Sequence, residues 1–398
     1  MITGNAPGTF FAAGQASKDS YIYENSGYAF FGNGTWHAND RLDITAGIRY
    51  TKEDKSADYN IDSNDPFSQL PLGLIASGAF AGLASLQTSP GVVPFDVDFE
   101  DDNISFAVSA SYEVSDALNV YARFAQGYKS GGFNLNRNGP NTAPGTPDRT
   151  ADYAALVAAD PSLTTLQSLQ NAVTFQPETA DAYELGFKSR WLDQRLKLDV
   201  TAFYQTLDNF QANSFNGTVF TIRNAGSLEG KGLELDYNFR ITDNFSATGG
   251  ATFQDISYKT FLGASGTAAQ GAVGVRTQDL SGEKPNFVSD VVLTGSFDYV
   301  QPISAKHEVS ARLGYRYRSD YTTGQDNDAI TTQGSFVTLD GSIGIQSVNG
   351  IWAFDIWGKN ITDETIASVI FDTPLQAGSF SAFLEAPATY GATLRLKY

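Results

Sequence analysis

Three acidic side chains in the segment PETADAYELGFK (177–188) have the residue types of a catalytic carboxylate pair. Two carboxyl groups about 5–10 Å apart across a substrate cleft perform glycoside hydrolysis. Asp181 and Glu184 are an odd number of residues apart, so a strand would point them to opposite faces. Glu178 and Glu184 share a face, but six residues of strand would hold them roughly 20 Å apart. We therefore expect no glycosidase centre, and we expect the protein not to be an enzyme.

Metal-binding and nucleophilic side chains are scarce in the rest of the chain. The 398 residues include no Cys, which excludes a disulfide framework, a thiolate metal site and a cysteine nucleophile. The two His residues are His37, in the turn-like WHAND, and His307, which begins HEVSARLGYRYR. We expect both to be structural. The sequence thus predicts no catalytic, cofactor-binding or metal site, and no cofactor.

Two acidic runs are the remaining candidates for binding a cation. FEDDN (99–103) and GQDNDA (324–329) offer the oxygen ligands that Ca²⁺ prefers. Solvated acid clusters are the commoner case, and that is the interpretation we favour for both. The formal net charge is −18 and no dense basic run occurs, so nucleic-acid binding is not expected.

The elements that carry these residues are predicted to be strands. Aromatic residues make up 13% of the chain and Gly, Thr, Ser, Tyr and Phe are abundant, a composition typical of β-sheet. Large or apolar residues alternate with polar ones over long segments. The clearest examples are RLDITAGIRY (41–50), RLKLDVTAFY (195–204), EVSARLGYRY (308–317), IWAFDIWGKN (351–360) and TYGATLRLKY (389–398).

These alternating segments are often 14 residues or longer, whereas soluble strands usually run about 5–6. Alternating lipid-facing and lumen-facing residues are typical of a transmembrane barrel, the one sheet whose backbone groups all pair in lipid. No apolar run is long enough for a spanning helix. The segment 70–86 comes nearest, and we interpret it as a loop with some helical content because it contains Pro71 and three Gly.

Short turns and long loops also alternate along the sequence, as they do in outer-membrane barrels. The short turns are predicted at 37–40, 114–117, 192–194, 242–244, 301–306 and 347–350. The long loops are predicted near 59–99, 135–177, 210–217, 261–284, 323–333 and 365–381. We count about thirteen strands, with 217–241 as one strand carrying a glycine bulge at 226–232. They are 22–38, 41–58, 100–114, 117–134, 178–192, 195–210, 217–241, 245–260, 285–300, 307–322, 334–347, 350–364 and 382–398.

Thirteen is an odd number, and antiparallel closure of a single-chain barrel requires an even one. The opening MITGNAPGTFFAAGQ also lacks the basic and apolar regions of a signal peptide. We therefore expect that the front of the complete protein is missing from this sequence. A fourteenth strand, in 8–22 or at the 226–232 break, would be needed for this chain to close alone.

Several motifs, in order, resemble the TonB-dependent outer-membrane receptor family over about 370 residues. They are NVYARFAQGYKSGGFN (119–134), PETADAYELGFKSRWLDQRLKLDVTAFYQTLDNFQ (177–211), RNAGSLEGKGLELDYNFRITDNFSATGGATFQD (223–255), WGKNITDET (357–365) and the terminal aromatic Tyr398. The family normally ends on Phe, so Tyr398 departs slightly from its pattern. The resemblance implies a 22-stranded barrel filled by a plug domain. Nothing here resembles the plug, so residues 1–398 would be a single barrel domain holding about 13–14 of those strands.

The resemblance further implies an active importer in the outer membrane of a Gram-negative bacterium. The ligand would be scarce, such as an iron–siderophore complex, and would bind at the outer loops. The partners implied are outer-membrane lipid and lipopolysaccharide, with the TonB complex acting only on the full-length receptor. Arg312, Arg316, Arg395 and Lys397 would face the lumen, most simply as solvated charges.

Tyr, Phe and Asn residues in two loop segments, 131–137 and 370–384, are candidates for ligand contact, although loop packing is the commoner role. Two alternatives to the importer stay open at this point. One is a truncated, non-functional remnant, which the missing signal peptide favours. The other is a stand-alone passive pore in the outer membrane. A soluble β-sandwich or β-helix is disfavoured by the strand lengths.

Overall fold

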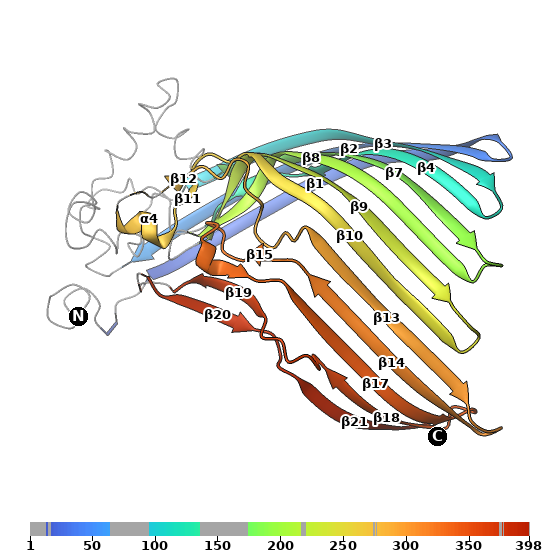
Figure 1. Cartoon of the computed structure of the whole chain (residues 1–398). Coiled ribbons are helices and arrows are strands. Elements are labelled where there is room, and N and C mark those ends of the chain that lie inside the picture. Colours follow the sequence, from blue (N-terminus) through green and yellow to red (C-terminus); the bar gives the residue numbers. More distant parts are fainter. Residues whose placement is uncertain are drawn as a thin grey trace.

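A computed structural model describes residues 13–14, 17–63, 95–135, 174–215, 220–273, 275, 277–373, 376 and 378–397. In this part of the chain, thirteen strands form one antiparallel sheet whose spatial order follows the sequence (Figure 1). They are β1 (Ser17–Asn39), β2 (Leu42–Ser63), β3 (Phe95–Ser115), β4 (Leu118–Lys129), β7 (Glu178–Trp191), β8 (Leu196–Phe215), β9 (Phe220–Arg240), β10 (Phe245–Thr260), β13 (Val291–Pro302), β14 (His307–Arg318), β17 (Phe336–Ser347), β18 (Trp352–Lys359) and β21 (Thr389–Leu396). The expected all-β, up-and-down fold with thirteen strands is confirmed.

Alternation divides the sheet into two faces, because consecutive side chains of a strand point in opposite directions. What we call the outer face carries the large apolar residues, and the ladders bring them side by side, as in Ile48 opposite Phe106 and Ile343 opposite Ile356. The aromatic rings of Phe124 and Tyr183 lie 4.8 Å apart on this face. Although apolar, outer-face side chains are exposed: Leu185 by 65% and Ile343 by 70%.

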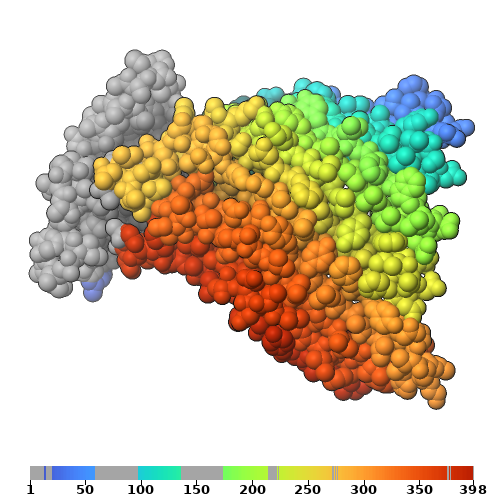
Figure 2. Space-filling view, viewed as in Figure 1, coloured from blue at the N-terminus to red at the C-terminus, as the bar shows by residue number. Residues whose placement is uncertain are grey.

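The inner face carries charged and hydroxyl side chains. Asp298 lies opposite Arg312, and Arg316 lies opposite Thr338, in the ladders on either side of β14. A register slip of one residue would move every apolar side chain to the other face. The ladders from β1 to β21 keep the two faces separate across the described sheet. In the space-filling view the colours cross the visible face in sequence order (Figure 2).

The short turns all lie at one end of the sheet, and the longer connections lie at the other (Figure 1). We call these the turn end and the loop end. Side chains fix several of the turns: Asn39 Oδ1, for example, accepts hydrogen bonds from the backbone N–H groups of Arg41 and Leu42. The predicted alternation of short and long connections is thus confirmed. Residues 64–94 and 136–173 of the expected loops 59–99 and 135–177 lie outside the described residues, and so does the segment 70–86 with its expected helical content.

The well-buried apolar side chains of the described residues gather mainly at the loop end. One cluster includes Leu228, Tyr258, Phe261 and Leu280, and a second joins Tyr321, Phe336 and Ile366. The connections at the loop end also contain short elements: β5 (Gly132–Phe133), β6 (Thr174–Phe175), β11 (Ala264–Ser265), α4 (Ala268–Ala272), β12 (Thr277–Gln278), β15 (Tyr321–Thr322), η2 (Ala329–Thr331), β16 (Thr332–Gln333), β19 (Ala367–Asp372) and β20 (Phe380–Leu384). The loop end is therefore a packed region at one end of the strands.

The glycine bulge that we expected within 226–232 is wrong in its position. β9 runs unbroken from Phe220 to Arg240, and its ladder with β8 shows no register shift. The irregularity lies across the ladder, between Tyr258 and Thr260 of β10. The 226–232 segment therefore contains no hidden extra strand. Among the described residues, no helix is both long and apolar enough to span a membrane.

Other boundaries also differ from the expected ones. β4 ends at Lys129 rather than at 134, and β13 begins at Val291 rather than at 285. The last predicted strand, 382–398, divides into β20 and β21, and β20 pairs with β19 instead of joining the large sheet. In each case contacts at the loop end replace the ladder of the main sheet.

Candidate functional site

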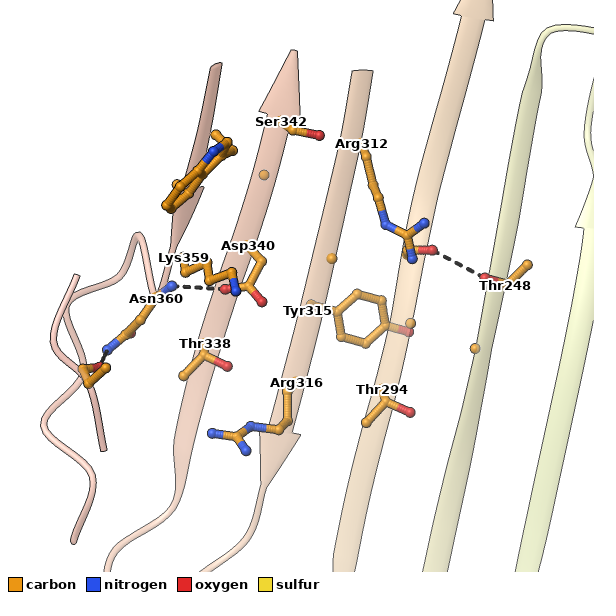
Figure 3. A pocket seen from close by; sticks show the side chains of 18 of the residues that line it. Thr248, Thr294, Arg312, Tyr315, Arg316, Thr338, Asp340, Ser342, Lys359 and Asn360 are labelled. Atoms are coloured by element: carbon orange, nitrogen blue, oxygen red, sulfur yellow. Dashed lines mark hydrogen bonds between the residues drawn. The ribbon is translucent and has the colours of Figure 1, made fainter. Parts of the chain in front are cut away.

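A hollow of about 760 Å³ opens on the inner face between β10 and the segment that follows β20. Alternate residues of β10, β13, β14, β17 and β18 point into it, because every second side chain of a strand lies on the same face. Figure 3 shows its polar lining, which includes Thr248, Thr294, Arg312, Arg316, Asp340 and Lys359. This hollow is the candidate binding surface of the inner face.

Two arginines of β14 give the hollow most of its positive charge. Arg312 Nη1 lies 3.2 Å from Asp298 Oδ1 on the neighbouring strand. Arg316 Nη2 donates to Glu385 Oε2 at 2.7 Å, and its guanidinium lies 5.1 Å from the ring centroid of Phe336. A guanidinium held by a carboxylate and a ring keeps its remaining N–H groups in a fixed direction. Arg316 is therefore an oriented donor on the hollow's wall, and Arg312 is held, among the described residues, by Asp298 alone.

The opposite side of the hollow combines a lysine, an indole and a carboxylate. The Lys359 ammonium lies 6.0 Å from the Trp357 ring centroid, and the Trp357 N–H donates to Thr393 Oγ1 at 3.0 Å. Asp340 Oδ1 accepts the backbone N–H of Asn360 at 2.8 Å (Figure 3). The hollow thus presents charges of both signs beside hydrogen-bonding groups.

Hydroxyl groups fill the space between these charges. Thr248 Oγ1 and Ser296 Oγ lie 3.1 Å apart, and Ser296 Oγ donates to Asp298 Oδ2 at 2.9 Å. Among the residues that line the hollow there is no His or Cys to act as a base or a nucleophile. The arrangement can bind through ion pairs and hydrogen bonds.

The cations that the sequence placed in the lumen lie as follows. Arg312, Arg316 and Arg395 are on the inner face, and Arg395 pairs with Asp355 of β18. Lys397 has the same parity but follows the last paired residue of β21, where its backbone N–H donates to Ile351 O at 2.8 Å. The hollow contains Arg312 and Arg316 but neither of the other two.

The motif that precedes β7 anchors neighbouring strands at the loop end. Glu178 Oε2 accepts the backbone N–H of Gln211 at 2.7 Å, so it fixes the upper part of β8. Asn224 of β9 holds the backbone of Gln176 from both sides: its Oδ1 accepts the N–H at 2.7 Å and its Nδ2 donates to the carbonyl at 2.9 Å. These motif residues therefore have a structural role that does not require a ligand.

The WGKNITDET motif has the same anchoring role after β18. Asn360 Nδ2 donates to Glu364 O at 2.9 Å and to Ala386 O at 3.3 Å, while its Oδ1 accepts the backbone N–H of Glu364 at 3.0 Å. Asp363 Oδ1 accepts the N–H of Ala388 at 3.0 Å. The motif thereby ties the segment that enters β21 to the wall of the hollow.

The expected ligand-contact segments are engaged in packing. Phe133 packs edge-on against Tyr23 and Phe99, with ring centroids 6.3 Å and 6.2 Å away. Asn134 uses both ends of its amide on the backbone of Ile222. In the 370–384 segment, the rings of Phe371 and Phe383 stack 5.7 Å apart. Positions 136–137, 374, 375 and 377 lie outside the described residues.

The two acidic runs behave differently from each other. In FEDDN, alternation separates Glu100, which pairs with Lys52 Nζ at 2.9 Å, from Asp101 on the opposite face. In GQDNDA, the expectation of a solvated cluster is wrong for Asp326, which is only 7% exposed. Its Oδ1 accepts the backbone N–H of Asp328 at 3.2 Å, and its backbone carbonyl accepts a hydrogen bond from Gln278 Nε2 at 2.5 Å. Within the described residues, no group of three or more His, Asp or Glu side chains is arranged to hold a metal ion.

The remaining candidates lie apart from the hollow. Asp181 and Glu184 point to opposite faces, and Glu184 lies 3.6 Å from Arg123, as a lumen charge pair. His37 Nδ1 contacts Asp43 Oδ1 at 2.6 Å near the first turn, and His307 Nδ1 lies 3.2 Å from Ser304 Oγ at another turn. Their positions agree with the structural roles expected for both histidines.

Sequence reasoning missed two buried side chains that join separate loops. Gln211 Nε2 donates to Ser130 O at 3.0 Å and Gln176 O at 3.1 Å. Thr323 Oγ1 donates to Thr331 O at 2.9 Å and accepts the backbone N–H of Ile370 at 2.8 Å. Both side chains contact residues far away in sequence, so no local spacing marks them in advance.

Comparison with known proteins identifies a family whose model matches most of this chain. The model of the family described as "TonB dependent receptor-like, beta-barrel" matches residues 2–361. Among curated proteins, the pesticin receptor of Yersinia enterocolitica is 25% identical over 212 residues, which cover 53% of this chain and 23% of that receptor. The pesticin receptor of Yersinia pestis matches to the same extent.

Solved structures share the fold at low sequence identity. The ferric yersiniabactin uptake receptor FyuA from Yersinia pestis gives a TM-score of 0.66 at 20% identity, covering 96% of this chain and 47% of its own. The ferric-catecholate import receptor Fiu from E. coli K12 gives a TM-score of 0.58 at 18% identity. The match covers 94% of this chain and 45% of that receptor. The copper transporter OprC gives a TM-score of 0.59 at 12% identity, and the match covers 94% of this chain and 48% of that transporter. The chain therefore spans about half the length of the solved structures that it matches.

Proposed function

The chain belongs to the TonB-dependent receptor-like β-barrel family, and we propose that it forms the barrel part of an active importer for a scarce ligand such as an iron–siderophore complex. Proteins of this family lie in the outer membrane of Gram-negative bacteria, and its members are receptors and transporters rather than enzymes. The observation that carries the proposal is the polar hollow on the inner face, whose lining includes Arg312, Arg316 and Lys359.

The outer face supports a membrane position for the sheet. It presents aromatic and aliphatic side chains such as Phe106, Leu185 and Ile356 over the height of the strands. Closer to the loop end the same face becomes charged: Lys52 pairs with Glu100 and Lys231 lies 3.3 Å from Asp255. The apolar part of this face suits the hydrocarbon core of a membrane, and the charged part suits head groups. We propose outer-membrane lipid and lipopolysaccharide as the partners of this face.

The loop end supports binding of a small ligand, because its described connections pack into two buried apolar clusters. Glu385 links the loop end to Arg316 on the inner wall. A polar hollow directly below an outer binding surface suits a ligand that is captured outside and passed inward. We propose that the TonB complex drives this step in the full-length receptor, where a plug would fill the lumen.

We propose that residues 1–398 are one barrel domain without a plug. β1 and β21 run in the same direction, because twelve antiparallel steps separate them. Two parallel edges cannot complete an antiparallel barrel with each other, so an odd number of further strands is needed. Residues 226–232 lie inside β9 and do not supply one, and residues 17–22 already belong to β1.

Uptake of radioactive iron tests the proposal. Iron-starved cells with and without the native gene would receive ⁵⁵Fe on catecholate, hydroxamate and carboxylate chelators, each with and without an uncoupler of the proton gradient. We expect uptake of at least one chelate to fall several-fold on deletion and to be abolished by the uncoupler.

Two results would count against the importer. Equal uptake of every chelate in both strains would contradict a role in iron import. Uptake that depends on the gene but resists the uncoupler would instead indicate a passive pore. A second experiment substitutes Arg312 and Arg316 by Ala in the native gene and measures the same iron uptake, which shows whether the hollow contributes to import. Substitution of the exposed Arg195 at the turn end by Ala is the matched control.

A further inference from the structure

A groove of about 560 Å³ crosses β3, β4, β7 and β8 on the outer face, between two rows of side chains. Neighbouring members of each row are partners in the ladders. The row nearer the loop end consists of Val108, Phe124, Tyr183 and Tyr204, and the row nearer the turn end consists of Ala110, Ala122, Leu185 and Ala202. We call this feature the outer groove.

The outer groove is long, narrow and apolar. Its two rows are two residues apart along each strand, which is about 7 Å, and its four strands span about 14 Å. Rings form one side: the centroids of Phe124 and Tyr183 lie 4.8 Å apart, and those of Tyr183 and Tyr204 lie 6.2 Å apart. Alanines keep the other side low, and Ala122 and Ala202 are exposed there. These dimensions suit one extended hydrocarbon chain.

The row of rings changes from apolar to charged as it crosses the sheet. On one side it continues to Ala46 of β2, opposite Val108. On the other it continues past Tyr204 to Lys231 of β9 and Asp255 of β10. Barrel strands tilt by about 35–45°, so a row across the strands climbs relative to the membrane plane. The two ends of the row therefore lie at different depths, with Ala46 at the level of hydrocarbon and Lys231 at the level of head groups.

Charged and hydroxyl groups gather where the outer groove meets β9. Lys231 Nζ lies 3.3 Å from Asp255 Oδ2, and both side chains are more than half exposed. Tyr204 Oη donates to Glu229 Oε2 at 2.9 Å, and Lys259 Nζ pairs with the same carboxylate. Ammonium groups bind phosphate, and carboxylates accept hydrogen bonds from hydroxyl groups. This end of the groove therefore suits a head group that carries both phosphates and hydroxyls.

The outer-face residues of β7 show at which height the outer groove lies. The strand from Trp191 at the turn end to Asp181 rises about 33 Å along its axis, or about 23–27 Å in height at the usual barrel tilt. The apolar band of a barrel is about 25 Å tall. Asp181, whose Oδ1 accepts from Gln126 Nε2 at 3.0 Å, thus marks the upper boundary of that band. Tyr183 and Leu185 lie just below it, on the side of the long outer loops.

From this geometry we propose that the outer groove seats one acyl chain of lipopolysaccharide, with the phosphorylated sugar head group at Lys231 and Lys259. The chain enters beside Tyr204 and runs across β8, β7 and β4 towards Val108. Lipopolysaccharide is the acylated, phosphorylated glycolipid of the leaflet on the loop side. The inference rests on the proposed function, because it assigns a site to the lipid partner of the outer face. It does not depend on which ligand is imported.

Native mass spectrometry of the full-length receptor in mild detergent would test the site. The probe is a short-sugar lipopolysaccharide of defined mass, titrated alone and against phosphatidylethanolamine. Ala122→Leu combined with Ala202→Leu fills the groove. Losing the burial of about two CH₂ groups predicts an apparent Kd about ten-fold weaker. Ala392→Leu enlarges an exposed outer-face alanine of β21, away from the groove, and should bind like the wild type.

A second variant tests the head-group end. Lys231→Gln combined with Lys259→Gln should weaken lipopolysaccharide binding several-fold, and unchanged binding would overturn the assigned head-group position. Equal affinity of the wild type and the filled variant would overturn the groove as the site. Displacement of lipopolysaccharide by an equal concentration of phosphatidylethanolamine would overturn the proposal in favour of an ordinary phospholipid.

A measurement on the native sequence decides if the filled variant does not fold. Lipopolysaccharide with a photoreactive acyl chain would be crosslinked to the receptor in nanodiscs, and the labelled peptides identified. We expect labelling to concentrate on β4 and β7. Even labelling over the whole outer face would contradict a seated chain. Iron uptake does not enter these readouts, so failure of the groove would leave the importer intact.

Discussion

Gly226 lies where β9 passes the bulged end of β10, and the bulge determines which residue fits there. The extra residue of β10 brings Thr260 against Gly226, and Ser227 N–H donates to Thr260 Oγ1 at 3.0 Å. A Cβ at 226 would overlap the Thr260 side chain and come within 2.8 Å of its carbonyl oxygen. Glycine is thus required by close approach of the neighbouring backbone.

Substituting Gly226 by Ala should therefore destabilise the sheet. We expect a loss of about 1–3 kcal/mol, the usual effect of overpacking. Urea unfolding in lipid vesicles, followed by tryptophan fluorescence, would measure it. Gly32→Ala is the control, since nothing lies within 4 Å of a Cβ there. Equal stability of the two variants would show that β10 can move away from β9 at no cost.

Asn360 combines a left-handed backbone with a fully used side-chain amide. Its φ is +47°, and its amide makes three hydrogen bonds to the backbone of Glu364 and Ala386. Buried groups that lose such partners cost about 1–3 kcal/mol each. Residue 360 is therefore predicted to control the order of the segment that enters β21.

Asn360→Ala and Asn360→Gly would separate the two contributions. Both lose the amide, but only Ala also has strain at positive φ. We expect faster proteolysis of segment 361–388 in both variants, with Ala more sensitive than Gly by a few-fold. Wild-type resistance in both would contradict an anchoring role for the side chain, and equal sensitivity would show that the backbone angle costs nothing.

At the scale of elements, we place the outer face of each strand against lipid and the inner face toward the lumen. Leu185 lies on the outer face of β7 and Thr201 on the inner face of β8, at the same level of the sheet. A positive charge on the lipid face of a barrel costs about 2–4 kcal/mol near the bilayer midplane, whereas lumen positions tolerate charge.

Leu185→Arg should therefore be far more harmful than Thr201→Arg. We expect the first variant to fold poorly into vesicles and the second to fold with nearly native stability. Folding yield, measured from the heat-dependent shift on a gel, compares them. If both variants fold equally well, the outer face is not in lipid.

Much of this element plan could be predicted from the sequence. Period-two alternation predicted the strands and their faces, because both depend on local patterns. The order of short turns and long loops predicted the count of about thirteen and the turn end. β19 lay inside an expected loop at 365–381, and β20 ran from that loop into the expected strand 382–398. The buried Asp326 lay inside an expected solvated run. Both arise from contacts such as Thr323 with Ile370, between residues that no local pattern relates.

At the scale of the whole molecule, the described sheet has two strands without a partner on one side. β1 and β21 each end the strand order, and unpaired edges invite association with other chains. We expect residues 1–398 expressed alone to form inclusion bodies and to refold poorly in detergent. A monomer that refolds cleanly and shifts on heating would contradict this and favour the pore.

The claim that the chain is the barrel part of a larger outer-membrane receptor can be tested by one measurement on native membranes. Intact mass and N-terminal sequencing would be applied to the outer-membrane polypeptide that ends in TYGATLRLKY (389–398). We predict a polypeptide that extends several hundred residues before Met1. A membrane protein that begins at Met1 would contradict the importer, and the absence of any such polypeptide from the outer membrane would support the remnant.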